Sequence, residues 1–339
     1  MSDLLADLTT LRLGGPARRL VTATSTGELV ELVRGADAAG ERVLLVGGGS
    51  NLVIGDDGWD GVVVLVRSDA VSVDIREGTV AVTADAGVSW DSLVARSVDE
   101  GWSGLAAMSG IPGSTGGTPV QNVGAYGSEV ADVISSVRVL DRETGGVEDW
   151  PAERCAFAFR TSAFKHTDRY VVLSVTFDLL LSDEAPPARY AELARRLEVE
   201  IGDTAPSARV REVVLDLRRS KGMVLDDRDP DTWSVGSFFV NMLVDEADVP
   251  PGCPHWPTDG RMKLSAAWLI ENAGFGKGFG LDRPPGTVAV STKHTLALTN
   301  RGGATTAQLL DLARLIRGGV EARYGLRLFP EAHLIGCAL

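Results

Sequence analysis

Hydrophobic positions in the first hundred residues follow two different spacings, which predict short strands mixed with helices. Apolar residues recur at helical spacing between Leu29 and Ala36, where Thr26 is placed to cap the helix and Gly40 to end it. Continuous or alternating apolar runs predict short strands over residues 43–46, 61–66, 71–75 and 79–84. This mixture is typical of an α+β protein.

Three more helices are predicted further along the chain. One is capped by Ser89 and ends at Gly101, one is capped by Ser207, and a long one covers residues 305–324 before Gly325. A prior of roughly 150 residues per domain divides the 339 residues into about two or three domains. A single small module is therefore excluded.

Composition and charge narrow the function classes. Hydrophobic residues make up 44% of the chain, and no apolar run approaches the ~20 residues of a membrane-spanning helix, so the sequence predicts a soluble globular protein. The formal net charge of −13 opposes attraction to nucleic acid or anionic lipid. An anionic ligand must therefore meet arginines and backbone N–H groups that are placed locally.

Targeting and metal signals are not evident in the sequence. The N-terminal residues lack a basic stretch followed by an apolar one, so we expect no secretion signal and a cytoplasmic protein. Cys155, Cys253 and Cys337 are too far apart for a disulfide framework or a metal-binding pair. The four histidines do not have the spacing of a zinc site, and we expect no metal.

Two glycine-rich segments are the main candidates for ligand binding. The strand predicted over residues 43–46 leads directly into Gly47–Asn51, and such a turn lets backbone N–H groups approach a phosphate. It is neither a Walker A loop nor a dinucleotide fingerprint, because no lysine follows and Leu52 occupies the last glycine position. A tight structural turn between two strands is the alternative.

The second segment, Ser109–Gly127, is denser in glycine and carries interleaved Ser, Thr, Gln and Asn. It offers bare backbone and small hydroxyls but little volume with which to build a core, which suits a long polar ligand. A flexible linker is the alternative, although linkers seldom hold so many apolar residues.

Several stretches, in this order and spacing, resemble the UDP-N-acetylenolpyruvoylglucosamine reductase (MurB) family, flavoproteins that make UDP-N-acetylmuramate for peptidoglycan. These stretches are residues 9–15, 47–51, 111–127, 159–165, 236–239, 263–270 and 330–331. The resemblance implies non-covalent FAD, NADPH as the hydride donor and UDP-N-acetylglucosamine enolpyruvate as a small-molecule substrate. The tyrosine loop near residue 190 resembles the longer, type I members.

The resemblance implies an α+β, vanillyl-alcohol-oxidase-like FAD-binding fold, in which two α+β subdomains cradle FAD and a separate α+β domain binds substrate. The first FAD-binding subdomain is expected over residues 1–68 with 325–339, and the second over residues 69–219. The substrate-binding domain is expected over residues 220–324.

Residues that would hold FAD follow from the same resemblance. They are Val46, Gly47, Gly48, Gly49, Ser50, Asn51 and Leu52 in the first segment, and Ile111, Pro112, Gly113, Ser114, Gly116, Gly117, Gln121, Asn122, Gly124, Ala125, Tyr126 and Gly127 in the second.

Three residues carry the catalytic roles that the resemblance implies. Reducing an enolpyruvyl ether needs a cation for the carboxylate, a proton donor and exclusion of water. Arg160, in an apolar-flanked stretch, would bind the carboxylate, and Ser237 would deliver the proton. Glu331 would help to stabilise or protonate the intermediate. Taken singly, each has a plainer alternative: a surface salt bridge, a turn serine and a solvated carboxylate.

Substrate binding is expected from Tyr190, Arg218, Lys221 and Asn241. The chain departs from the family pattern at Phe159, where a tyrosine is common, and at Val240, where a polar or basic residue is common. Residues 104–107 also lack a common acidic residue. Two other functions stay open: an FAD-dependent sugar or alcohol oxidase of the same fold, and a flavin-containing binding protein without turnover.

Overall fold

The computed structural model describes residues 3–258 and 260–339, and their contacts group the chain into two units. Unit 1 comprises Met1–Ala17, Gly49–Asp60 and Ser220–Leu339, and unit 2 comprises Arg18–Gly48 and Gly61–Arg219. This grouping does not distinguish the three expected domains, which remain a prediction. Within the described residues, no helix is both long and apolar enough to span a bilayer.

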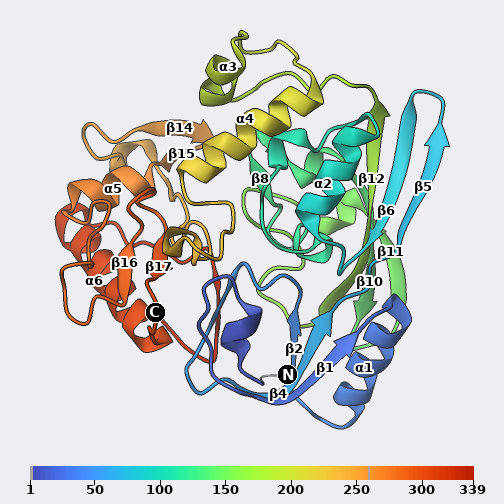
Figure 1. Cartoon of the computed structure of the whole chain (residues 1–339), viewed down its shortest axis with the longest axis horizontal. Helices are drawn as coiled ribbons and strands as arrows, with labels where there is room; N and C mark the ends of the chain where they lie inside the picture. The colour runs from blue at the N-terminus through green and yellow to red at the C-terminus, as the bar shows by residue number, and fades with distance from the viewer. Residues whose placement is uncertain (1–2, 259) are drawn as a thin grey trace. The chain divides into compact units, whose positions relative to one another are not determined.

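Unit 2 is built around a three-stranded sheet of order β1-β4-β2 and a six-stranded antiparallel sheet of order β11-β10-β12-β6-β5, with β7 paired to β12 (Figure 1). The strands are β1 (Ala17–Ala23), β2 (Val43–Val46), β4 (Trp59–Val66), β5 (Val71–Arg76), β6 (Thr79–Asp85), β7 (Trp102–Ser103), β10 (Ile134–Asp141), β11 (Val147–Pro151) and β12 (Tyr170–Leu181), with the small hairpin β8 (Gly124–Ala125) and β9 (Ser128–Glu129). The four strands predicted over 43–84 are confirmed, with ends moved by at most two residues.

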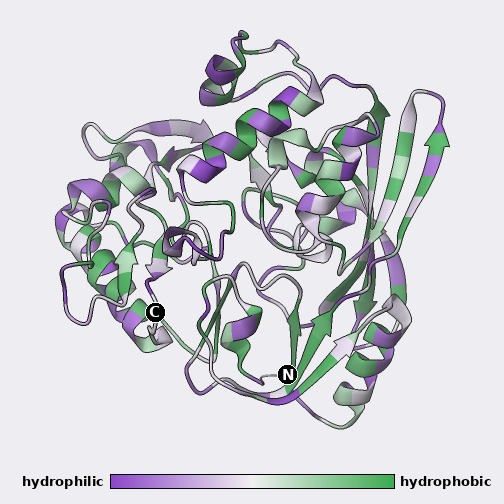
Figure 2. Ribbon diagram, in the orientation of Figure 1, coloured by the Kyte–Doolittle hydropathy of each residue, from purple (hydrophilic) through white to green (hydrophobic). Residues whose placement is uncertain are grey.

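The helices of unit 2 are α1 (Thr26–Ala38), α2 (Trp90–Asp99), α3 (Ala191–Leu197) and α4 (Ser207–Ser220). The predictions that Thr26 caps α1 and that Ser207 caps α4 are wrong, since Ser207 is already the first residue of α4. Ser25 is the N-cap of α1, because its backbone is extended and its hydroxyl accepts the N–H of Glu28, whereas Thr26 is already helical. Figure 2 shows hydrophilic and hydrophobic bands alternating along α1, whose apolar face is buried.

A bulge in β12 lets one strand serve two apolar cores. Val171 and Leu173 pack with α1, whereas Val175 and Phe177 pack with α2. The pairing of β10 with β12 shifts between Arg138 and Val139, so one extra residue is inserted in β12. Since side chains alternate between the faces of a strand, one inserted residue turns the following odd-numbered residues to the other face.

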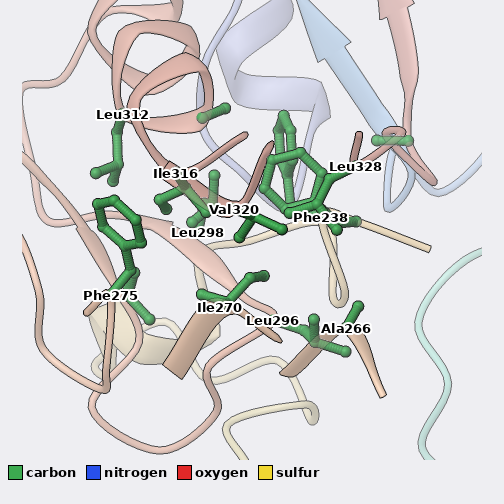
Figure 3. Packing of buried hydrophobic residues seen from close by; sticks show 14 of the residues in the cluster. Phe238, Ala266, Ile270, Phe275, Leu296, Leu298, Leu312, Ile316, Val320 and Leu328 are labelled. Atoms are coloured by element: carbon green, nitrogen blue, oxygen red, sulfur yellow. The ribbon is translucent and has the colours of Figure 1, made fainter. Parts of the chain in front are cut away.

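Unit 1 combines short strands with two helices. Its strands are β3 (Leu52–Ile54), β13 (Leu243–Val244), β14 (His255–Thr258), β15 (Arg261–Leu264), β16 (Val288–Val290), β17 (Leu298–Asn300) and β18 (His333–Ile335), and its helices are α5 (Ala266–Asn272) and α6 (Thr306–Tyr324). β18 pairs in parallel with β3, joining the end of the chain to residues near its start. Figure 3 shows the core, in which Phe238, Ile270 and Phe275 lie near α6.

Helix α6 confirms the predicted long helix and its stop. Thr305 caps it in a reciprocal capping box with Gln308, and Gly325 ends it in the left-handed conformation. Two glycines lie together in its last turns. A Cβ at Gly319 would come within 2.3 Å of the Phe275 ring, whereas a Cβ at Gly318 would meet no atom within 4 Å.

The two glycines of α6 should respond in opposite ways to alanine. Gly318→Ala should raise the free energy of unfolding by up to about 1 kcal/mol, because alanine favours helix over glycine. Gly319→Ala should lower it by about 1–3 kcal/mol, because the Phe275 ring must move. Urea unfolding followed by tryptophan fluorescence would measure both. Equal effects of the two substitutions would contradict this packing.

Candidate active site

The first glycine-rich turn lies against the second within unit 2. A Cβ at Gly48 would lie 2.5 Å from the Cα of Gly113, and a Cβ at Gly47 would lie 2.1 Å from the Ser114 hydroxyl. Only glycine permits this approach of two backbones. Among the described residues, the N–H groups of Gly48, Gly113 and Ser114 meet no hydrogen-bond acceptor. A cradle of this kind fits a phosphate group, as the predicted FAD site requires.

Arg67 holds the first turn from its carbonyl side. Its Nη1 donates to the carbonyls of Val66 at 2.8 Å and Gly47 at 2.9 Å, with Val46 at 3.5 Å. Arg67 directly follows β4, which runs parallel to β2. The guanidinium therefore adds a positive charge beside the turn, in a chain of net charge −13. We did not predict Arg67 from the sequence, where its position after a strand was the available signal.

The remaining residues of the first segment belong to unit 1. Gly49 is left-handed, with φ +62°, and its carbonyl accepts the N–H of Thr10 at 3.3 Å. The carbonyl of Asn51 accepts the N–H of His333 at 2.9 Å, and Leu52 begins β3. Here the segment is tied to the N-terminal and C-terminal stretches of the chain.

An ion pair anchors the start of the second segment. Asp91 of α2 accepts the N–H of Gly110 at 2.6 Å and both guanidinium nitrogens of Arg211 of α4, at 2.6 and 2.9 Å. Burial raises the pKa of Asp91, but the bonds from Arg211 and Gly110 lower it overall. Neither Asp91 nor Arg211 was predicted from the sequence, because the three partners meet only in the fold.

Parts of the second segment are used by the protein itself. The N–H of Thr115 donates to Val88 and that of Gly116 donates to Ala86, so these groups fix the segment to the chain before α2. Asn122 is 1% exposed, and its amide bonds Glu129, Ala158 and Ala131. Its contact with FAD stays a prediction.

Arg160 lies in a tight turn that reaches the second segment. Ala158 and Thr161 exchange both backbone hydrogen bonds around Phe159 and Arg160, and Arg160 has a left-handed φ of 54°. Its Nη2 donates to the carbonyl of Gly124 at 2.8 Å and its Nη1 to that of Asn122 at 3.3 Å. Arg160 is half-buried and meets the predicted FAD segment, so it is not a solvated surface arginine.

Ser237 and Glu331, 94 residues apart in the sequence, come together in unit 1. The N–H of Glu331 donates to the carbonyl of Phe238 at 2.8 Å, and Phe239 forms a bridge with Pro330. Both Ser237 and Glu331 are half-buried. The Ser237 hydroxyl makes no side-chain hydrogen bond with any described residue, so it is not committed to holding the turn.

The predicted substrate-binding residues are distributed over the two units. In unit 2, Tyr190 is the N-cap of α3 and packs edge-on against Tyr126, with ring centroids 5.6 Å apart. Burial raises the pKa of Tyr126 to about 12, although the charge of Arg218 opposes the shift. Arg218 itself is 9% exposed, and burial lowers its pKa.

The other two lie in unit 1. Lys221 is half-buried just after α4, and Asn241 accepts the N–H of Ala266 at the start of α5 with its Oδ1 at 3.0 Å. Metal chemistry has no evident site: no cluster of three or more His, Cys, Asp or Glu suited to an ion occurs in the described ranges.

Comparisons with known proteins agree with this geometry. Residues 17–149 match the family model "FAD binding domain", and residues 229–335 match "UDP-N-acetylenolpyruvoylglucosamine reductase, C-terminal domain". The UDP-N-acetylenolpyruvoylglucosamine reductase of Salinispora arenicola is 56% identical over 99% of this chain and 95% of its own. That of Thermobifida fusca is 53% identical over 99% of this chain and 97% of its own.

A solved structure shows the same fold. UDP-N-acetylenolpyruvylglucosamine reductase from Thermus caldophilus superposes with a TM-score of 0.67 at 24% identity, covering 98% of this chain and 97% of that one. The matched domain and the relatives show that the chain is an FAD-binding oxidoreductase, and the expected α+β FAD-binding fold is confirmed. The chain belongs to the UDP-N-acetylenolpyruvoylglucosamine reductase family, as predicted.

The glycine cradle gives a direct test of the FAD site. Gly48→Ala should leave the purified protein with at most about a tenth of the wild-type FAD, since the added methyl collides with the backbone of Gly113. Gly35→Ala is the matched control, because a Cβ there meets no atom within 4 Å. Flavin absorbance per polypeptide measures both. Full flavin content in Gly48→Ala would refute the cradle.

Proposed function

We propose that this protein reduces the enolpyruvyl double bond of UDP-N-acetylglucosamine enolpyruvate to give UDP-N-acetylmuramate, a precursor of peptidoglycan. NADPH is the hydride donor, and FAD is bound without a covalent link. The relatives support the substrate, because the Salinispora arenicola protein, which is 56% identical over 99% of this chain, is a UDP-N-acetylenolpyruvoylglucosamine reductase. A small anionic substrate and a cytoplasmic location belong to the same proposal.

The observation that carries the proposal is the pairing of the Ser237 and Glu331 segments. Reduction of the alkene needs a proton at the carbon next to the carboxylate, and a solvent-exposed serine is a poor donor for it. Ser237 is half-buried and comes one residue before Phe238, whose carbonyl accepts the N–H of Glu331, and this pairing fits a proton donor and its carboxylate partner. Ser237 donates the proton, and Glu331 helps to stabilise or protonate the intermediate.

Arg160 binds the carboxylate of the substrate. Charge builds on the carbon next to that carboxylate during reduction, so a fixed cation stabilises the transition state more than the ground state. Arg160 donates to the neutral carbonyls of Asn122 and Gly124, and these hydrogen bonds orient the guanidinium. When bound, FAD would supply hydride transfer, in which the hydride comes from NADPH and goes to the alkene.

The decisive experiment asks whether NADPH oxidation requires the sugar nucleotide. The purified protein should be yellow, and NADPH should bleach it. Oxidation should continue only when UDP-N-acetylglucosamine enolpyruvate is added, with one molecule of UDP-N-acetylmuramate formed per NADPH. NADPH oxidation at the same rate with oxygen as the only acceptor would contradict the proposal, and flavin reduction by simple sugars or alcohols, followed by reoxidation by oxygen, would favour an oxidase of the same fold.

Ser237→Ala should separate the two halves of the reaction. Flavin reduction by NADPH asks for no protein acid, so its rate should stay within about threefold of the wild type. Flavin reoxidation by substrate should fall by about 10²–10⁴-fold, the usual worth of general acid catalysis. Stopped-flow absorbance of the flavin measures each half. Equal slowing of both halves would assign Ser237 to the turn instead.

Tyr190 should act on substrate binding. As a lid residue it closes over the sugar nucleotide. Tyr190→Phe should therefore raise KM for the substrate by about 3–30-fold, which corresponds to the loss of one hydrogen bond from the hydroxyl. Flavin bleaching by NADPH should be unchanged. The edge-on contact with Tyr126 survives in this variant, which limits the change to the hydroxyl. Wild-type steady-state constants would make Tyr190 only the start of α3.

A further inference from the structure

Left-handed backbone is concentrated around Arg160. Of the seven non-glycine residues with positive φ in the described ranges, five lie between residues 122 and 166. These are Asn122, Tyr126, Ala156, Arg160 and His166. Such conformations are unfavourable for residues other than glycine, and they persist only where the surrounding hydrogen bonds and packing enforce them. We therefore consider which hydrogen bonds hold Asn122 and Arg160 in the left-handed conformation.

Asn122 forms hydrogen bonds to the Arg160 turn with both its side chain and its backbone. Its Nδ2 donates to the carbonyl of Ala158 at 3.2 Å, where the turn begins. Its backbone carbonyl accepts Nη1 of Arg160 at 3.3 Å. One buried residue thus holds the turn at its base and the guanidinium at its tip. Asparagine suits this position because it tolerates the left-handed backbone, here φ 46°.

Glu129 fixes the orientation of the Asn122 amide. Its Oε2 accepts Nδ2 of Asn122 at 2.7 Å, while the N–H of Ala131 donates to Oδ1 at 3.1 Å. Glu129 is in turn held as the N-cap of a short 3-10 helix, Val130–Asp132, in a reciprocal capping box with Asp132. Every polar atom of the amide therefore has a partner on a fixed element.

We propose that Asn122, oriented by Glu129, is a positioning residue that holds the Arg160 guanidinium ready for the substrate carboxylate. The proposal rests on the role of Arg160 stated under Proposed function. A guanidinium that must bind a planar carboxylate depends on its angle, and a displacement of about 1 Å can cost a rate of 10²-fold. Asn122 and Glu129 supply the constraint that a long, flexible arginine side chain lacks.

The test swaps the donor and the acceptor of the Asn122–Glu129 hydrogen bond by substituting both residues. Asn122→Asp keeps the size, the left-handed tolerance and the acceptor for Ala131, but it removes both donors and faces a second carboxylate. Flavin reoxidation by substrate should slow by about 10–100-fold. Glu129→Gln should stay within about threefold of the wild type, because the glutamine oxygen still accepts from Asn122.

The double variant Asn122→Asp with Glu129→Gln should recover at least about fivefold of the loss, because the glutamine amide donates to the new carboxylate. In Asn122→Asp, flavin reduction by NADPH should slow less than reoxidation by substrate, with both rates measured per bound flavin because Asn122 is also an expected FAD contact. Glu153→Gln, an exposed acid in unit 2, is the control and should behave as the wild type. A rescue of this kind has no explanation in a purely structural role.

Several outcomes would overturn the proposal. Asn122→Asp with wild-type reoxidation would do so, as would equal slowing of both half-reactions or a double variant that recovers nothing. If Asn122→Asp does not fold, Glu129→Ala decides: it should slow reoxidation about 3–10-fold, and a wild-type rate would overturn the proposal. A wild-type protein that does not turn over the enolpyruvyl substrate would instead refute the proposed function.

Discussion

Two backbone hydrogen bonds hold the chemistry of unit 1 together. The N–H of Glu331 donates to the carbonyl of Phe238, and the N–H of Val240 donates to the carbonyl of Phe329. They join a segment near the end of the chain to one that lies beside the core phenylalanines. Since Phe238 and Phe239 are fully buried, the pairing is anchored in the core rather than formed by two loops at the surface.

The core of unit 1 makes this pairing rigid. Phe238 and Phe239 pack edge-on at 5.0 Å, and the N–H of Phe238 donates to the carbonyl of Leu296. Helix α6 packs against the same core (Figure 3). The absence of a side chain at Gly319 leaves room for the Phe275 ring against the helix. A side chain that must deliver a proton at a fixed point needs a scaffold of this kind, because proton transfer depends on hydrogen-bond reach.

Unit 2 also holds its predicted site residues in fixed positions, but through different contacts. It uses close backbone contact at glycine and enforced left-handed residues, where unit 1 uses packed aromatic rings. Gly48 meets the backbone of Gly113, and the Arg160 guanidinium meets the carbonyls of Asn122 and Gly124. These contacts leave little side-chain volume beside the cradle, which is what a long, flat ligand requires. Arg67 donates a hydrogen bond to the Gly47 carbonyl of the first segment, and Asp91 accepts the Gly110 N–H of the second.

Local patterns predicted four of the six α-helices in the described residues and the strands β2, β4, β5 and β6, but not the long strands β10 and β12. The strands of residues 43–84 and helix α6 were predictable because their periodicity and caps are contained in short windows. The cap of α1 was displaced by one residue, since Ser25 and Thr26 are both good caps and only the backbone conformation chooses between them.

The site was predictable where a motif names its residues and not where the fold assembles them. The glycine-rich segments are visible in the sequence, but their contact at Gly48 and Gly113 joins residues 65 positions apart. Arg67, Asp91 and Arg211 are ordinary charged residues until strands and helices bring them to the segments. The same holds for Glu129, whose carboxylate meets the Asn122 amide only in the folded chain. Contacts of this kind depend on tertiary structure, which no short window contains.

The central claim is that the backbone pairing makes Ser237 and Glu331 act at one reacting centre, and a double-variant cycle measures it. Flavin reoxidation by the enolpyruvyl substrate would be timed in Ser237→Ala, Glu331→Gln and the combined variant. Groups that share one centre should be coupled by at least about 1 kcal/mol, with the combined loss smaller than the sum of the two single losses. Additive losses, within about 0.5 kcal/mol, would show that the two side chains act independently and would contradict the account.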